Sequence, residues 1–331
     1  MGADYIFACA RVRGAEKNLL GKDKLGIMVE AKTMEDALKV LSEAQYGNEG
    51  EVVQPADYER LLGQETAKLY DFMKEIAPGE GAFRIFSYPF DYHNIKTLLK
   101  AEALGTDGKS ILMSGGTIDP AAMAILVKER NFMPMTGHMK TADEDSVDTL
   151  ARTRDPQSID LICDRECYAD ILEAAKASGN PFVLGYVQLL IDTINLKTFV
   201  RVRKMGQPWS FFGTVFLPGG TISEKTFVAG YEEPIHQFAA RLEGTALYGA
   251  AQEGLESMKE TGSFTSIERL CDDAVMKYVK DAKYISFGIE PLIAYTAAKQ
   301  AEIKSVRIVL AGKAAGLAPN LIRERLRETY G

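Results

Sequence analysis

The chain has 331 residues, and its 39 Lys and Arg side chains are outnumbered by 46 Asp and Glu, which gives a formal charge of −7. Apolar residues make up 46% and charged residues 26%, as in ordinary globular proteins, which argues against disorder and against collagen-like repetition. An acidic chain lacks the clustered positive charge of a general nucleic-acid-binding protein. We therefore expect no nucleic-acid partner.

The sequence offers no obvious membrane span or export signal. The most apolar run, Phe182–Ile191, is interrupted by Gly185 and Gln188 and falls short of the roughly 18–20 apolar residues that cross a bilayer. Asp4 and Arg11 lie where a signal peptide needs an unbroken apolar region. Four cysteines in so long a chain fit a reducing cytosol better than a disulfide framework. We expect a cytoplasmic protein that can dock at a membrane.

The N-terminal part predicts two helices. Apolar residues in Tyr5–Leu20 recur at i, i+3 and i+4 before Gly21, which suits the C-terminal cap of a helix. Thr33, followed three residues later by Asp36, resembles a capping arrangement that opens a second helix. That helix is expected to end near Gly47.

Further along, two Asp-Pro pairs predict helix starts. Asp119 and Asp155 each provide a capping carboxylate before a proline, and the second helix should run to about Ser178. Strand-like runs are few, namely Phe83–Tyr88 and Ser210–Leu217. Two isolated runs do not supply the strand–helix alternation of an α/β fold, so we predict an all-α protein.

Three windows of the chain resemble one another without a gap. They are Asp91–Gly105, Asp192–Gly206 and Glu302–Gly316, and each begins with an acid, ends with glycine and carries an apolar stripe at helical spacing. We expect the acid to stabilise a helix N-terminus and the glycine to end the helix.

A second motif supports the repeat. Gly-Gly-Thr-Ile occurs at 115–118 and again at 219–222, shortly after the first two windows, and is missing after the third. The repeat predicts three helical units at residues 25–118, 119–222 and 223–331. A closing helix in residues 1–24 and another at the C-terminus would be left to pack together.

One segment has a relaxed likeness to a phosphate-binding loop. Ala103 to Lys109 and Ser110 resemble the P-loop pattern, but Ala103 replaces its first glycine and an amphipathic helix stands where a buried strand is required. We expect a surface loop, with nucleotide binding at Lys109 as the alternative.

The sequence predicts no metal, cofactor or catalytic site. Cys163 and Cys167 are four residues apart on an expected helix, and Cys271 is a distant third ligand at best. Structural zinc needs four ligands, and none of the chain's three histidines lies near these cysteines in the sequence. Buried, inert thiols are the simpler interpretation.

Two asparagines occupy the same position within their windows. Asn94 and Asn195 each lie beside the apolar stripe, where they could bind a ligand or form hydrogen bonds at a buried seam between helices. We favour the structural role at the seam.

Six basic residues form the candidate interface. Three of them occupy one position beside the stripe in each window and belong either to a solvated face or to a basic rim. The other three are clustered near the end of the second window. The set consists of Lys96, Lys197, Arg307, Arg201, Arg203 and Lys204.

Several segments together resemble a known family. Tyr5–Arg13, Phe90–Lys100 and Phe287–Leu292, with Glu302 and Arg307, are similar to the C subunit of archaeal and bacterial A/V-type ATP synthases and to the related d subunit of eukaryotic V-ATPases. The resemblance covers essentially the whole chain, including its length and its threefold repeat.

The resemblance implies a fold and a role. It implies a funnel-shaped, all-helical protein with three similar units around a central cavity. Such a protein is a non-catalytic socket on the cytoplasmic face of the membrane. It links the rotor ring of proteolipid subunits to the D and F subunits of the central stalk, with the membrane stator as a further partner. ATP turnover would thereby be coupled to transport of H⁺ or Na⁺, without a cofactor or small-molecule substrate. A helical scaffold unrelated to rotary motors is the alternative.

Overall fold

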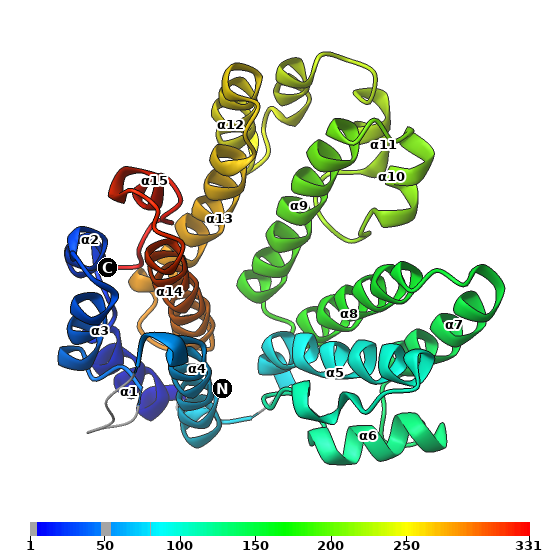
Figure 1. Cartoon of the computed structure of the whole chain (residues 1–331), viewed down its shortest axis with the longest axis horizontal. Coiled ribbons are helices and arrows are strands. Elements are labelled where there is room, and N and C mark those ends of the chain that lie inside the picture. The colour runs from blue at the N-terminus through cyan, green and yellow to red at the C-terminus, as the bar shows by residue number, and fades with distance from the viewer. Residues whose placement is uncertain (1–4, 48–53, 80) are drawn as a thin grey trace. The chain divides into compact units, whose positions relative to one another are not determined.

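A computed structural model describes residues 5–47, 54–79 and 81–331. Helices make up all the regular secondary structure in these ranges, which confirms the all-α prediction (Figure 1). Both predicted strand-like runs are wrong, because Phe83–Tyr88 enters a long helix and most of Ser210–Leu217 forms a short one. Phe86, Tyr88 and Phe212 of these runs are buried, and Phe212 packs against Phe199, so a local preference for strands is overridden by packing.

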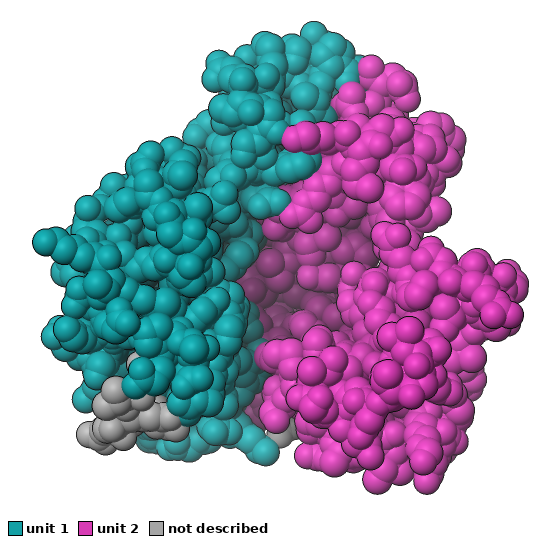
Figure 2. All heavy atoms as spheres, viewed as in Figure 1, with its two compact units in different colours: residues 1–78, 233–331 teal, residues 79–232 magenta. Residues whose placement is uncertain are grey.

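The chain forms two compact units, which Figure 2 shows in separate colours. Unit 1 combines residues 1–78 with residues 233–331, and unit 2 consists of residues 79–232.

Unit 1 is built around the long helix α14. This helix packs against α1, α2, α3, α4 and α13, while α12 packs against α13. Apolar residues from both parts of the unit share one core, for example Met28 and Leu62 with Val306 and Leu310. The elements are α1 (Ile6–Glu16), α2 (Lys22–Glu30), α3 (Met34–Glu43), η2 (Pro55–Asp57), α4 (Tyr58–Ile76), η5 (Ile235–Leu242), α12 (Tyr248–Thr261), α13 (Thr265–Lys280), η6 (Asp281–Tyr284), α14 (Glu290–Ala314) and α15 (Pro319–Arg323).

The two N-terminal predictions had different outcomes. The helix predicted over Tyr5–Leu20 ends early, at Glu16, and Gly21 has extended backbone as the N-cap of α2 rather than ending α1. The prediction for Thr33 is confirmed, because its hydroxyl accepts a hydrogen bond from the Asp36 backbone N–H at 3.1 Å.

Unit 2 holds the helices of the first two windows, α5 and α9. Helix α5 packs against α6, α7 and α8, whereas α9 packs against α8 and α10. The cap predicted at Asp119 is confirmed, since its carboxylate accepts from two N–H groups at the start of α6. Asp155 likewise accepts from the Gln157 backbone N–H, but Pro156 is the N-cap of α8 rather than its first helical residue. The elements are η3 (Gly81–Phe83), α5 (Arg84–Leu104), η4 (Gly108–Ile111), α6 (Pro120–Glu129), α7 (Gly137–Thr153), α8 (Gln157–Ala177), α9 (Pro181–Lys204), α10 (Trp209–Val215) and α11 (Glu224–Ala229).

Helix α9 is the one element of the described chain with the length and composition of a membrane span. Its most apolar window has a mean hydropathy of 1.2, and 61% of that window is buried in the protein. Such burial is typical of a core helix, so the composition is weak evidence for a span.

Candidate functional site

The glycines and the acids of the three windows behave differently. Gly105, Gly206 and Gly316 follow the last turns of their helices with φ of 65°, 68° and 68°, which confirms their predicted role as helix ends. The expected N-terminal role of the acids is wrong, because all three lie in the middle of their helices. Asp91 lies within α5, Asp192 within α9 and Glu302 within α14.

Asp91 instead holds the loop that follows its own helix. Its Oδ2 accepts hydrogen bonds from the Thr117 backbone N–H and from the Thr117 hydroxyl, both at 2.8 Å. Its Oδ1 accepts from the Ile118 backbone N–H at 3.1 Å. Asp91 is fully buried, and burial raises the pKa of its carboxyl while these donors lower it. We call this arrangement a carboxylate clasp.

The same clasp recurs at the second window. Asp192 accepts from the Thr221 backbone N–H at 3.0 Å, from the Thr221 hydroxyl at 2.6 Å and from the Ile222 backbone N–H at 3.0 Å. Both clasps therefore use the Thr-Ile pair of a Gly-Gly-Thr-Ile motif. This explains in physical terms why the windows and the motifs recur together.

The two asparagines strengthen the clasps. Asn94 exchanges two hydrogen bonds with the backbone of Met113, at 2.9 and 2.8 Å, and Asn195 does the same with Leu217, at 2.8 and 2.9 Å. Both asparagines are buried. Their partner is the loop backbone after the helix, whereas the sequence pattern suggested a partner on a neighbouring helix.

The paired glycines are required by geometry. Gly115 and Gly219 adopt φ of 109° and 103°, values that side chains rarely permit. At Gly116 a Cβ atom would lie 2.8 Å from Cγ of Asp91, and at Gly220 the corresponding distance to Asp192 is 2.9 Å. Each second glycine therefore lets the loop backbone reach the carboxylate.

The acid of the third window binds a segment near the N-terminus instead of a loop that follows its own helix. Glu302 of α14 accepts a hydrogen bond from the backbone N–H of Leu20, which precedes the N-cap of α2, Gly21. In the other clasps, the residues after Ile118 and Ile222 are likewise the N-caps of α6 and α11. All three acids therefore hold the residue just before the N-cap of a helix.

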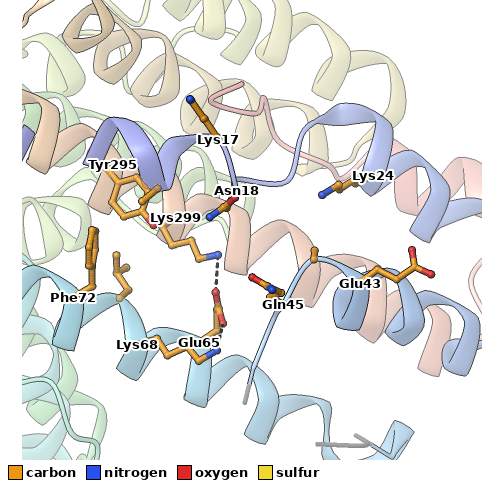
Figure 3. A pocket seen from close by; sticks show the side chains of 13 residues that line it. Lys17, Asn18, Lys24, Glu43, Gln45, Glu65, Lys68, Phe72, Tyr295 and Lys299 are labelled. Carbon is orange, nitrogen blue, oxygen red and sulfur yellow. Dashed lines mark ion pairs between the residues drawn. The ribbon is translucent and has the colours of Figure 1, made fainter. Parts of the chain in front are cut away.

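The third junction also contains a buried lysine. Lys299 Nζ lies 2.6 Å from Glu302 and 2.7 Å from Glu65, and it lies 4.5 Å from the ring centre of Tyr46. Burial opposes the charge of Lys299, but the two carboxylates together raise its pKa. In Figure 3, Lys299 reaches from α14 to Glu65 of α4 inside a cavity of about 340 Å³. The lining also includes Lys17, Lys24 and Lys68.

The three basic residues beside the stripe have different surroundings. Lys96 of unit 2 is half-buried, and its Nζ lies 2.5 Å from Oδ1 of Asp164. Arg307 is exposed and lies 3.0 Å from Glu59 in unit 1. Lys197 is half-buried in α9.

The cluster at the end of α9 divides into two kinds of residue. Arg201 and Lys204 are exposed. Arg203 is half-buried, with its guanidinium 5.4 Å from the ring centre of Phe199 and 5.7 Å from that of Tyr231. Arg203 therefore helps to cover an aromatic cluster between α9 and α11, which makes it a packing residue as well as a charge.

Exposed apolar residues follow this cluster directly. Met205 is 67% exposed and Trp209, at the start of α10, is 52% exposed. This short stretch of chain thus carries two exposed basic residues, Arg201 and Lys204, and two exposed apolar ones, and we call these four residues the α9 end.

The P-loop-like segment has a different layout from a nucleotide site. Lys109 is exposed in the turn Gly108–Ile111, and the element before it is helix α5 rather than a strand. Its backbone N–H donates to the side chain of Asp107 at 3.2 Å, so that amide is already engaged by a carboxylate.

The cysteines are buried thiols. Cys163 and Cys167 lie in α8 of unit 2, whereas Cys271 lies in α13 of unit 1. Burial raises the pKa of Cys163 to about 12, which keeps this sulfur protonated and unsuited to metal binding at neutral pH.

Comparison with known proteins places the chain among ATPase subunits. The profile of the family described as ATP synthase (C/AC39) subunit matches residues 8–325. The chain is 24% identical to the C subunit of the V-type sodium ATPase of Enterococcus hirae, over 96% of this chain and 97% of that one. It is 27% identical to the C subunit of the V-type ATP synthase of Thermus thermophilus, over 95% of both chains.

An archaeal relative extends the same pattern. The C subunit of the A-type ATP synthase of Methanocaldococcus jannaschii is 24% identical, over 98% of this chain and 86% of that one. Bacterial and archaeal relatives thus match along nearly the full length. The chain therefore belongs to the ATP synthase (C/AC39) subunit family, as a C subunit of the A/V-type ATP synthases.

Proposed function

We propose that the chain is a non-catalytic coupling protein, a socket that transmits torque between the central stalk and the membrane rotor ring of an A/V-type ATPase. The clasp repeated at Asp91, Asp192 and Glu302 carries this proposal. Each clasp ties a long core helix, α5, α9 or α14, to the start of another helix, α6, α11 or α2. Buried, hydrogen-bonded junctions of this kind resist deformation, as a torque-bearing part must.

The clasps also support a closed threefold arrangement. In the third junction, the N-terminal Leu20 supplies the donor that a Gly-Gly-Thr-Ile loop supplies elsewhere. Three units at 25–118, 119–222 and 223–331, with the N-terminal segment closing the last onto the first, account for this pattern. We therefore propose three similar units around a central cavity, in the form of a funnel.

The partners follow from this role. We propose that the funnel contacts the proteolipid ring and the D and F subunits of the central stalk at the cytoplasmic face of the membrane, with the membrane stator as a further neighbour. Of the six candidate interface residues, Arg201 and Lys204 fit a docking surface best, because the exposed Met205 and Trp209 follow them closely in the chain. A basic and apolar surface of this kind resembles the anchor residues of protein interfaces.

A deletion experiment tests the coupling role. A complex that lacks this protein should hydrolyse ATP in its soluble sector but should not pump ions into vesicles, since only the mechanical linkage is missing. The measurements are ATPase activity and ion uptake, H⁺ or Na⁺, with and without the purified protein added back. Normal uptake by the deleted complex would refute the coupling role and favour an unrelated scaffold.

A further inference from the structure

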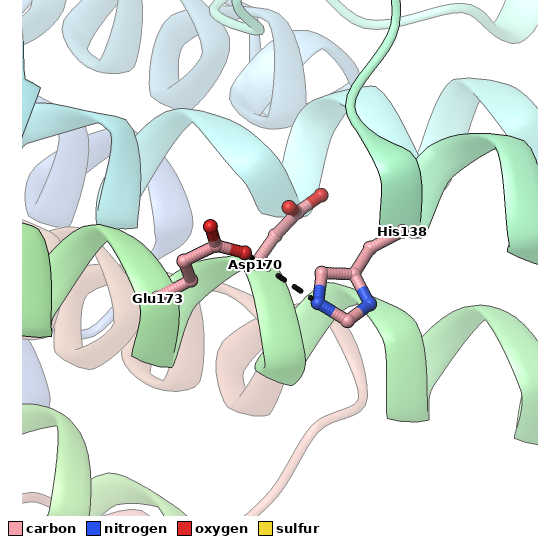
Figure 4. A group of neighbouring side chains, drawn as sticks. All are labelled: His138, Asp170 and Glu173. Carbon is pink, nitrogen blue, oxygen red and sulfur yellow. Dashed lines mark ion pairs between the residues drawn. The ribbon is translucent and has the colours of Figure 1, made fainter.

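A histidine and two carboxylates converge in unit 2, between α7 and α8. Figure 4 shows His138, near the start of α7, facing Glu173 of α8, with Asp170 one turn away on α8. The potential ligand atoms of these three side chains all lie within 4.8 Å of one another. His138 Nε2 and Glu173 Oε2 are 3.6 Å apart.

A fourth side chain orients the histidine. His138 Nδ1 lies 2.7 Å from Oε2 of Glu166, which is buried and also accepts from Arg165 Nε at 3.0 Å. A carboxylate only accepts hydrogen bonds, so Nδ1 carries the proton of this contact. In the neutral imidazole, Nε2 then has the free lone pair, and it faces Glu173. Metal-binding histidines are commonly held in this way by an outer carboxylate.

Asp170 is also held in place for such a role. Its Oδ2 accepts hydrogen bonds from the Tyr92 hydroxyl at 2.7 Å and from the Thr136 hydroxyl at 2.6 Å. Both hydroxyls donate to Oδ2, so Oδ1 is left to act as a metal ligand. Glu173 is largely exposed, so its side chain has the freedom to close onto an ion.

The two carboxylates of the cluster line a cavity. Asp170 and Glu173 line a space of about 430 Å³ together with Thr136 and Arg84. This volume admits a hydrated ion and leaves room for water in the remaining coordination positions. Within the described residues, no other group of His, Cys, Asp and Glu side chains converges in this way.

We propose that His138 Nε2, Asp170 and Glu173 bind a divalent transition-metal ion, with Glu166 as the outer carboxylate that orients the imidazole. One nitrogen and two oxygen ligands fit Zn²⁺, whereas Mg²⁺ and Ca²⁺ prefer oxygen ligands alone. The ion would connect α7 to α8 and so fasten the hairpin of these two helices.

Titration of the full chain with ZnCl₂ tests this site. The protein is first treated with EDTA, and binding is followed by isothermal titration calorimetry, with bound metal counted by mass spectrometry. We expect one Zn²⁺ per chain and a higher melting temperature in its presence. Glu166→Gln should weaken binding by about 10–100-fold, because the imidazole loses its orienting acceptor.

Two ligand variants and one control complete the design. His138→Ala should abolish stoichiometric binding, and Glu173→Gln, a nearly isosteric change at a largely exposed side chain, should weaken it at least tenfold with the fold intact. His236→Ala, which removes a histidine of unit 1, should leave binding unchanged. Absence of Zn²⁺ binding, or equal affinity in wild type, His138→Ala and Glu173→Gln, would overturn the proposal. In that case the cluster is a set of polar contacts between His138 and its neighbouring carboxylates, with no role in metal binding.

Discussion

The carboxylate of Asp91 occupies the space that a side chain on Gly116 would need. A Cβ atom there would lie 2.8 Å from Asp91 Cγ, inside van der Waals contact. The buried acid and the glycine are therefore one structural feature, since the acid can bond to the loop only where no side chain intervenes.

Gly116→Ala should lower the free energy of unfolding of unit 2 by about 2–4 kcal/mol, because the loop must move and Asp91 loses donors while it stays buried. The chain's only tryptophan, Trp209, lies in unit 2, so its fluorescence during urea unfolding reports on this unit. Gly137→Ala is the matched control, since a Cβ there meets no atom within 4 Å. Equal stability of the two variants would contradict the clasp geometry.

A second prediction concerns the pH dependence of stability. Asp143 is buried; its Oδ1 accepts from Arg130 at 3.1 Å, and its Oδ2 has no hydrogen-bond partner in the described chain. Burial raises the pKa of Asp143 to about 6, although Arg130 opposes this. Between the ordinary pKa of about 4 and pH 6, the folded state therefore binds more protons than the unfolded state, so stability falls as pH rises through 6.

Asp143→Asn removes this ionisation. The free energy of unfolding of the variant, relative to that of wild type, should therefore rise by about 1 kcal/mol between pH 5 and pH 8. The lost contact with Arg130 adds a constant difference in stability that cancels when the two pH values are compared. Urea unfolding followed by Trp209 fluorescence at both pH values gives the difference. A difference that stays the same at both pH values would mean that Asp143 titrates as an ordinary carboxyl.

A third prediction concerns the buried lysine of unit 1. Lys299→Met should cost about 3–5 kcal/mol, because Glu65 and Glu302 are then left as like charges without a cation. Lys304→Met on the same helix removes a half-exposed lysine that pairs with Asp272, and it should cost less than about 1 kcal/mol. Thermal unfolding followed by far-UV circular dichroism compares the two. Equal losses of stability in Lys299→Met and Lys304→Met would show that the buried ion pairs of Lys299 stabilise the fold no more than an exposed pair does.

A fourth prediction concerns the docking surface. The double variant Arg201→Glu, Lys204→Glu should bind the rest of the complex at least about tenfold more weakly than wild type at low salt. Added salt should reduce this difference in affinity, because rim charges act mainly through long-range attraction. Lys128→Glu with Lys176→Glu changes the net charge equally at exposed positions of unit 2 and serves as the control. Binding is measured as reassembly with complexes stripped of this protein. Equal binding of both variants would place the docking surface elsewhere.

Arg203 is not changed in the double variant because its side chain also contributes to packing. Its guanidinium lies against Phe199 and Tyr231, so reversal of its charge would disturb packing as well as docking. The sequence grouped Arg203 with Arg201 and Lys204 because spacing along a helix does not reveal which neighbour covers a side chain.

The sequence predicted local features well and long-range partners poorly. Caps at Thr33 and Asp119 and the helix-ending Gly105 depend on nearby backbone, and all three were predicted correctly. Asp91 was assigned to a helix terminus by the same local rule, although its partners lie far along the chain. The co-occurrence of each window with a Gly-Gly-Thr-Ile motif was the available signal for that partnership.

The His138 cluster had no such signal. His138 and Asp170 belong to separate helices, and only the packing of α7 against α8 brings them together. Neither residue lies in a recurring window, and the spacing of possible metal ligands in the sequence pointed to the cysteines, which proved to be buried thiols. A contact that depends on the angle between two helices leaves no pattern in the order of residues.

The junction between Glu302 and Leu20 has a consequence for the order of events during biosynthesis. The core of unit 1 joins α2 and α3, which are made early, to α14, which is made near the end. Unit 2 is contiguous and can fold as it leaves the ribosome, whereas the N-terminal helices must wait for almost the whole chain. In the nascent chain, Met28 and Leu41 therefore remain without their final partners, and a chaperone has its longest opportunity to act at this end of the polypeptide.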